Sequence, residues 1–299
     1  MNRVTNSMTS RTTLRDLNMS LGRLQDRQAD LSTGRVIRKV SDDPTAAVDA
    51  MGIRNELRRA DQRSRSLNDA QGWLQTADTA LVSGLDILAR VKELTVRGSN
   101  SGVLDPTSRF AIATEISGLR SELLAIANTK YLDRPVFNGT AVGAAYSTTG
   151  VYNGNDAVVL REVGPGTVIS ANLTGEQVFG IGTTPSSVDG NLFEVLARLQ
   201  TAILNGNTTA TATEHANLDT ATKRLASGAA EIGTRAGRID NLRNRAAVDR
   251  LSMSGRLSGL EDADLAKALL GVKTSENAYN AALQAAARIL PASLLDYLR

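Results

Sequence analysis

The chain has 299 residues, of which 41% are hydrophobic but only 3% aromatic, so it can bury cores built from aliphatic side chains, as long helical packing does. It contains no cysteine, which excludes disulfide bonds, thiolate metal ligands and cysteine nucleophiles. The small net charge of +3 and the alternation of acidic and basic residues are typical of solvated helix faces, not of a nucleic-acid-binding surface.

The first predicted helix carries an apolar a/d seam that only a helical partner can cover, formed by Leu14, Leu17, Leu21, Leu24 and Leu31. An isolated helix of this length is marginally stable in water. A comparable seam lies near the other end of the chain, formed by Leu265, Leu269, Val272, Tyr279, Leu283 and Leu290. We therefore expect these two terminal seams to pack together as a coiled coil, and their residues are the candidate assembly interface.

Residues 1–10 are polar and lack the apolar centre of a secretory signal peptide. No apolar run approaches the roughly 20 residues that a membrane-spanning helix needs. The sequence thus favours either a cytosolic protein or export by a route without a cleaved signal.

Between the terminal seams the sequence predicts long helices. Gly34 is a helix stop, and the acids before Pro44 are a helix start. The helix from Pro44 to Arg97 would be roughly 80 Å long. Asp105 and Pro106 open a third helix, which should end near Asn128 and fold back on the second.

The character changes after Tyr131, where turn signals separate β-rich runs at 157–163 and 167–173. Residues 136–189 are predicted to form a small β-rich insertion that leans on the helices. Helices resume at Asn191, are interrupted by residues 205–212, and continue from about Thr213 with a seven-residue repeat. The glycines at 255 and 259 are a candidate joint before the last helix.

The predicted fold is mainly α, with paired terminal coiled-coil helices, an elongated helical bundle and a small β-rich inserted domain. The predicted inner coiled-coil domain comprises residues 1–43 and 255–299. The bundle domain comprises residues 44–135 and 190–254, and the insertion residues 136–189.

Nothing in the sequence points to catalysis. The single histidine, His215, has no second His or Cys with which to share a metal, and no P-loop, dinucleotide-binding or zinc-protease motif occurs. We expect neither an enzyme nor a cofactor nor a metal site. Trp73 lies within the long helix and is predicted to anchor the bundle core, with a subunit contact as the alternative.

The flanks of the first seam carry almost no charge that could select a partner helix. A two-helix hairpin also leaves much of each helix uncovered. We hypothesise that the chain ends are loose in the monomer and become ordered when neighbouring subunits surround them.

Several stretches resemble the bacterial flagellin superfamily. They are residues 24–34, 68–81, 88–94, 173–180 and 260–298, together with Ser-Asp-Asp-Pro at 41–44. The last motif is more similar to the hook-associated protein 3 family, at the hook–filament junction, than to the filament flagellins, which tend to have Ala-Asp-Asp-Ala-Ala-Gly there.

The resemblance implies a secreted structural protein of the bacterial flagellum that links the hook-associated proteins to the filament. The implied partners are the other hook-associated protein of the junction, flagellin, copies of itself in a ring and a flagellar export chaperone, with no nucleic acid and no membrane. The first alternative is a flagellin that forms the filament itself, since it would have the same apolar seams on its terminal helices. A cytosolic coiled-coil adaptor is an alternative of another class.

Overall fold

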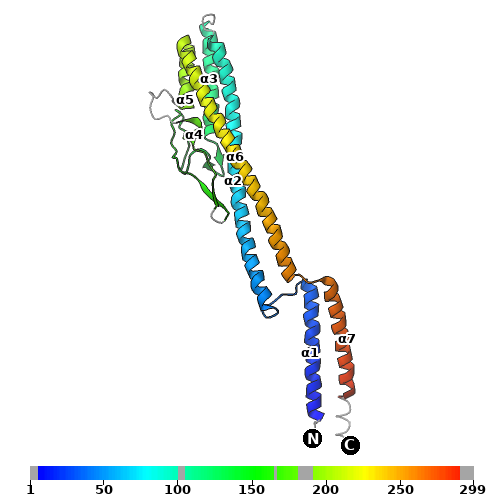
Figure 1. The fold of residues 1–299 in the computed structure, drawn as a ribbon. Helices are drawn as coiled ribbons and strands as arrows, with labels where there is room; N and C mark the ends of the chain where they lie inside the picture. The colour runs from blue at the N-terminus through cyan, green and yellow to red at the C-terminus, as the bar shows by residue number, and fades with distance from the viewer. Residues whose placement is uncertain (1–5, 100–104, 165–166, 181–190, 290–299) are drawn as a thin grey trace. The chain divides into compact units, whose positions relative to one another are not determined.

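The computed structural model describes residues 6–99, 105–164, 167–180 and 191–289 (Figure 1). Its elements are α1 (Asn6–Thr33), α2 (Pro44–Ser99), α3 (Pro106–Ala127), β1 (Lys130–Tyr131), β2 (Arg134–Pro135), β3 (Leu160–Gly164), β4 (Thr167–Ser170), α4 (Gly175–Phe179), α5 (Leu192–Leu204), α6 (Thr208–Glu261) and α7 (Leu265–Ile289). The predicted mainly-α fold is confirmed. No helix in the described part of the chain combines the length and the apolarity needed to cross a bilayer.

The chain divides into two compact units. The terminal unit comprises Met1–Arg59 and Asp249–Arg299, and the central unit comprises Ala60–Val248. Helices α2 and α6 therefore contribute residues to both. The finer division into three domains, with the β-rich insertion as a domain of its own, stays a prediction.

In the terminal unit, α1 and α7 pack side by side, and the start of α1 lies at the same end of the pair as the end of α7 (Figure 1). The predicted pairing of the terminal helices is thus confirmed. The helix α1 stops before Gly34, whose φ of 65° is a left-handed conformation that glycine adopts without a Cβ clash. The helix α2 then begins at Pro44, as the sequence predicts.

In the central unit, α2 and α6 run along each other with matched seven-residue repeats. Fully buried side chains line both helices: Leu67, Leu74, Leu81 and Leu88 on α2, and Leu218, Leu225, Ile232 and Ile239 on α6. Polar contacts fix this alignment, with Gln71 Nε2 2.8 Å from Asp240 Oδ1 and Lys92 Nζ 2.6 Å from Asp219 Oδ1. Helix α3 packs against α5.

The β-rich segment contains two small antiparallel sheets, β1–β2 and β3–β4. Three of its aromatic side chains, Phe137, Tyr146 and Phe179, are buried in the same core as Phe193 of α5. The expectation that this segment leans on the helices is therefore confirmed. The short helix α4 was not predicted, because its five residues are too few to show a helical period.

The predicted interruption at residues 205–207 is confirmed, but the predicted start of the helix that follows and the joint predicted within it are wrong. The helix begins at Thr208 rather than near Thr213, because the Asn207 side chain accepts a hydrogen bond from the Ala210 amide at 3.0 Å and caps it. Gly255 and Gly259 lie inside α6, which ends only at Glu261. A helical glycine costs about 1 kcal/mol relative to alanine, too little to interrupt so long a helix.

Candidate functional site

The seam of α1 is covered by α7 along a narrow line. Leu24 is 8% exposed, whereas Leu17, Leu21 and Leu31 are half-buried. Leu14 is 45% exposed. Two residues of α1 that the apolar pattern missed, Ser20 and Asp30, are also buried.

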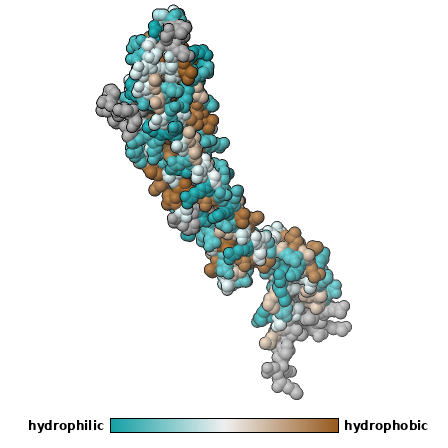
Figure 2. Space-filling view, turned by 45° about the horizontal axis from the view of Figure 1, so that its top comes forward, coloured by the Kyte–Doolittle hydropathy of each residue, from teal (hydrophilic) through white to brown (hydrophobic). Residues whose placement is uncertain are grey.

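The seam of α7 is more exposed than that of α1. Val272 and Tyr279 are half-buried, but Leu265, Leu269 and Leu283 are 61%, 53% and 39% exposed. Leu290 lies outside the described residues. Among the residues of this helix whose burial is described, Ala286 is the buried one. Hydrophobic residues also lie among polar ones on the visible surface of the terminal unit (Figure 2). Much of the leucine surface thus remains available to another helix.

The loop of residues 34–43 is hydrogen-bonded to the last residue of α6 and to the segment that follows it. The Val36 amide donates to the Glu261 carbonyl oxygen at 2.8 Å, and the Ala263 amide donates to the Gly34 carbonyl oxygen at 2.8 Å. These bonds connect the end of α1 to the start of α7. We call residues 34–43 and 262–264 the joint of the terminal unit.

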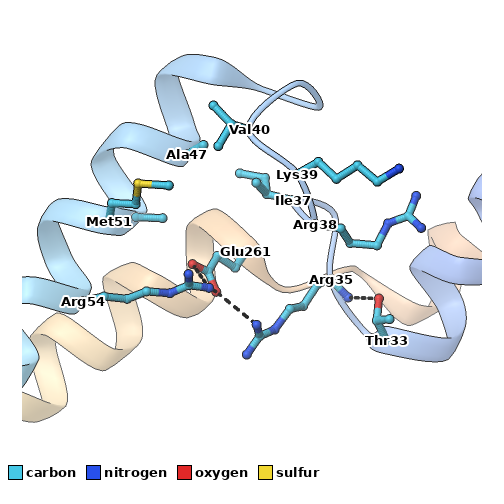
Figure 3. A pocket seen from close by; sticks show the side chains of 11 residues that line it. Thr33, Arg35, Ile37, Arg38, Lys39, Val40, Ala47, Met51, Arg54 and Glu261 are labelled. Carbon is cyan, nitrogen blue, oxygen red and sulfur yellow. Dashed lines mark hydrogen bonds and ion pairs between the residues drawn. The ribbon is translucent and has the colours of Figure 1, made fainter.

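An ion pair reinforces the joint. The Glu261 side chain is 4% exposed, and its carboxylate lies 2.7 Å from the Arg54 guanidinium of α2 and 3.9 Å from that of Arg35 (Figure 3). On the other side of the loop, Arg38 lies 3.3 Å from the Asp30 carboxylate of α1. A carboxylate this well enclosed needs cationic partners, so these arginines hold α1, α2 and α6 to the joint.

Three aspartates order the backbone of the joint. Asp42 accepts the amides of Lys39 and Arg38 at 2.9 and 3.0 Å, and these hydrogen bonds hold the pKa of its carboxyl group below the usual range. Asp43 caps α2 by accepting the Thr45 and Ala46 amides, and Asp264 caps α7 in the same way. These side-chain hydrogen bonds therefore hold the backbone of the joint in one defined conformation.

A pocket of about 570 Å³ lies between this loop and the first turns of α2 (Figure 3). Its apolar wall includes Val40 and Met51, which are about half exposed, and its rim carries Arg35 and Lys39. The lining offers apolar contact and positive charge but no nucleophile paired with a base.

Two residues singled out in the sequence lie in the central unit. Trp73 is buried and packs edge-on against Tyr131, with ring centroids 6.0 Å apart, so its predicted role as a core residue is confirmed. His215 is half-buried within α6. In the described ranges, no group of three or more His, Asp or Glu side chains is arranged to hold a metal ion.

Comparison with known proteins agrees with this architecture. Residues 4–141 match the family model of the bacterial flagellin N-terminal helical region. The chain is 26% identical over 254 residues to flagellar hook-associated protein 3 of Salmonella typhimurium, covering 78% of this chain and 80% of the relative. It is 25% identical over 276 residues to flagellin of Bacillus subtilis, covering 89% and 88%.

A solved structure shares the fold. The flagellar junction protein FlgL of Legionella pneumophila aligns over 72% of this chain and 100% of its own, with a TM-score of 0.57 and 16% sequence identity. At this identity the likeness concerns the fold alone.

Proposed function

The chain belongs to the bacterial flagellin superfamily, and we propose that it is a structural component of the flagellum at the junction between the hook-associated proteins and the filament. Its relatives are structural flagellar proteins. The bacterial flagellum is therefore where this chain acts, among flagellar partners.

One observation carries the proposal: the paired terminal helices leave large leucine side chains exposed. Leu265 and Leu269 of α7 are more than half exposed, and Leu14 of α1 nearly so. Soluble proteins rarely expose several large apolar side chains close together unless that surface binds another protein. In a ring of identical subunits, the terminal helices of neighbouring copies would supply that cover.

The proposed partners follow from this position. Copies of the chain would form the ring, the other hook-associated protein would lie below it and flagellin above it. A chain without cysteine can pass unfolded through the flagellar export apparatus without disulfide cross-links, with a cytosolic chaperone as its escort. We infer secretion by that route.

A deletion strain tests the proposal. Loss of the junction should leave hooks intact while flagellin is released unassembled into the medium. The wild-type gene should restore filaments, and a copy with Leu21→Asp and Leu283→Asp should not. A matched control with Gln25→Asp and Asn280→Asp places the same charges at exposed polar positions of the same helices. Normal filaments on the deletion strain would overturn the proposal.

The similarity to flagellin of Bacillus subtilis over 89% of the chain favours a second candidate, the filament subunit itself. The two roles differ in copy number. A filament subunit would polymerise alone into long filaments and dominate the sheared filament fraction. A junction protein would stay a minor component of that fraction and would not extend filaments.

A further inference from the structure

The central unit has a surface groove between α2 and α3. Its volume is about 540 Å³, and its lining includes Thr76, Thr79, Ala80, Ile126 and Tyr131. The described residues that line it include no charged side chain. Gly72 lets Tyr131 lie across the floor, because a Cβ at this position would collide with the tyrosine hydroxyl group. The groove is thus an apolar depression with a neutral polar rim.

The same helix–helix boundary is acidic at one end of the groove. Asp86 lies one turn before Arg90 on α2, and Glu122 lies one turn before Ile126 on α3. The Arg90 guanidinium lies 2.7 Å from the Glu115 carboxylate, so these two positions of α2 and α3 lie opposite each other. Asp86 and Glu122 therefore lie between the groove and this ion pair. Both are exposed, and neither pairs with another described residue.

The outer face of α6 has the complementary character. Arg238, Asn241, Arg245 and Val248 are spaced three and four residues apart, so they share one face, and all four are exposed. Val248 is 67% exposed. Neither Arg238 nor Arg245 pairs with another residue in the described ranges. This α6 outer face thus presents two free positive charges and one apolar side chain.

Lengths and charges match between the two surfaces. The α6 outer face spans the eleven residues 238–248, a rise of about 15 Å, and fits within the α2 row from Gly72 to Asp86, which rises about 21 Å. With Val248 in the groove, Arg245 and Arg238 would extend towards Asp86 and Glu122. The contact cannot form within one copy, because α6 packs on α2 through its opposite face, which carries the buried Ile232 and Ile239.

We propose that the α6 outer face of one copy docks in the α2–α3 groove of the next copy. The contact joins two different surfaces, and its repetition gives a ring where the rotation from copy to copy closes. The inference rests on the proposed function, since it supplies a subunit contact for the ring. The proposed contact is a helix bound in a groove. The negative charges at the acidic end of the groove determine which way the docked α6 helix runs along it.

Engineered cysteines test this contact directly, since the chain has none of its own. A Thr79→Cys variant and a Val248→Cys variant, each with a different epitope tag, would be expressed together in the deletion strain. Mild oxidation of isolated flagella should give a disulfide-linked dimer that carries both tags. The control pairs the Thr79→Cys variant with a Thr213→Cys variant in place of Val248→Cys. Thr213 is exposed and lies about 50 Å from Val248 along α6.

Charge reversal provides the second arm. Arg238→Glu with Arg245→Glu should lower the cross-link yield about tenfold, because like charges would then face each other. Adding Asp86→Arg and Glu122→Arg should restore the yield, which a folding defect could not do. A yield no higher than that of the Thr213→Cys control would overturn the inference. If filaments form normally in that experiment, only the docking contact fails, whereas failure of the proposed function would appear in the deletion strain itself.

Discussion

The Arg54 guanidinium lies 2.7 Å from the Glu261 carboxylate, although 207 positions separate these residues in the sequence. This ion pair joins α2 to the last residue of α6 beside the loop that follows α1. It is a long-range contact of the joint, and the stability of the terminal unit should depend on it.

Arg54→Ala should destabilise the joint by about 1–2 kcal/mol, because Glu261 would then keep only the more distant Arg35 as an ionic partner. The Arg54 side chain is 41% exposed, so the effect stays below that of a fully buried pair. Faster amide hydrogen exchange at Val36 and Ala263 is the measurement. Arg58→Ala, one turn further along α2, is the control, and equal effects of the two variants would contradict the prediction.

The two classes of seam leucine should respond differently to truncation. Leu24→Ala should destabilise the α1–α7 pair by about 2 kcal/mol, because its side chain is almost fully covered. Leu14→Ala should leave the monomer nearly unchanged, since its side chain is 45% exposed. Hydrogen exchange across α1 in the two monomers would measure the difference. A larger loss of protection in Leu14→Ala than in Leu24→Ala would refute this division of the seam.

Much of the architecture could be predicted because its signals are local. The seven-residue repeats of α2 and α6, the leucines of the terminal seams and the helix start at Pro44 all lie within short windows of sequence. An apolar a/d seam also indicates that a partner helix must cover it. The pairing of α1 with α7 could therefore be predicted.

The rest depends on contacts between distant residues. Nothing around Glu261 in the sequence indicates that it is buried, because its partner Arg54 lies on another helix. The heptad pattern likewise treats Leu265 and Leu24 as equivalent, yet the first is exposed and the second is covered. The heptad pattern predicts which residues can be buried. Which of them are buried depends on the geometry of the two-helix pair.

A pair of glycine substitutions separates backbone conformation from side-chain packing. Gly34→Ala should destabilise the end of α1 by about 1–2 kcal/mol, because its φ of 65° disfavours a residue with a Cβ. Gly22→Ala, in the middle of the same helix, should stabilise α1 by about 0.5–1 kcal/mol, since nothing lies within 4 Å of the added methyl group. Helix melting followed by circular dichroism compares them, and shifts of the same sign would contradict the argument.

Alkaline pH should loosen the β-rich segment of the central unit. Burial raises the pKa of Tyr152 from about 10 to about 12, because a charged phenolate is disfavoured away from water, and the negative charges of Asp156 and Glu176 add to this effect. The neutral hydroxyl group donates to the Phe137 and Asn155 carbonyl oxygens. A raised pKa means that the stabilisation is complete below about pH 10 and is lost as pH rises through about 12. Ultraviolet absorbance of tyrosinate follows the titration.

Tyr152→Phe is the matched control for that prediction, because it keeps the ring but removes the titrating group. Its alkaline unfolding should be less steep in this pH range. A wild-type protein whose Tyr152 titrates at its ordinary pKa would contradict the role of burial.

The central claim is that the exposed seam leucines of the terminal helices are covered by neighbouring copies in the assembled flagellum. A Leu269→Cys variant tests it most directly, because this side chain is 53% exposed and the chain has no other cysteine. A thiol reagent should label the purified monomer quickly and the same protein in intact flagella at least tenfold more slowly. Equal labelling rates in the two states would contradict the account.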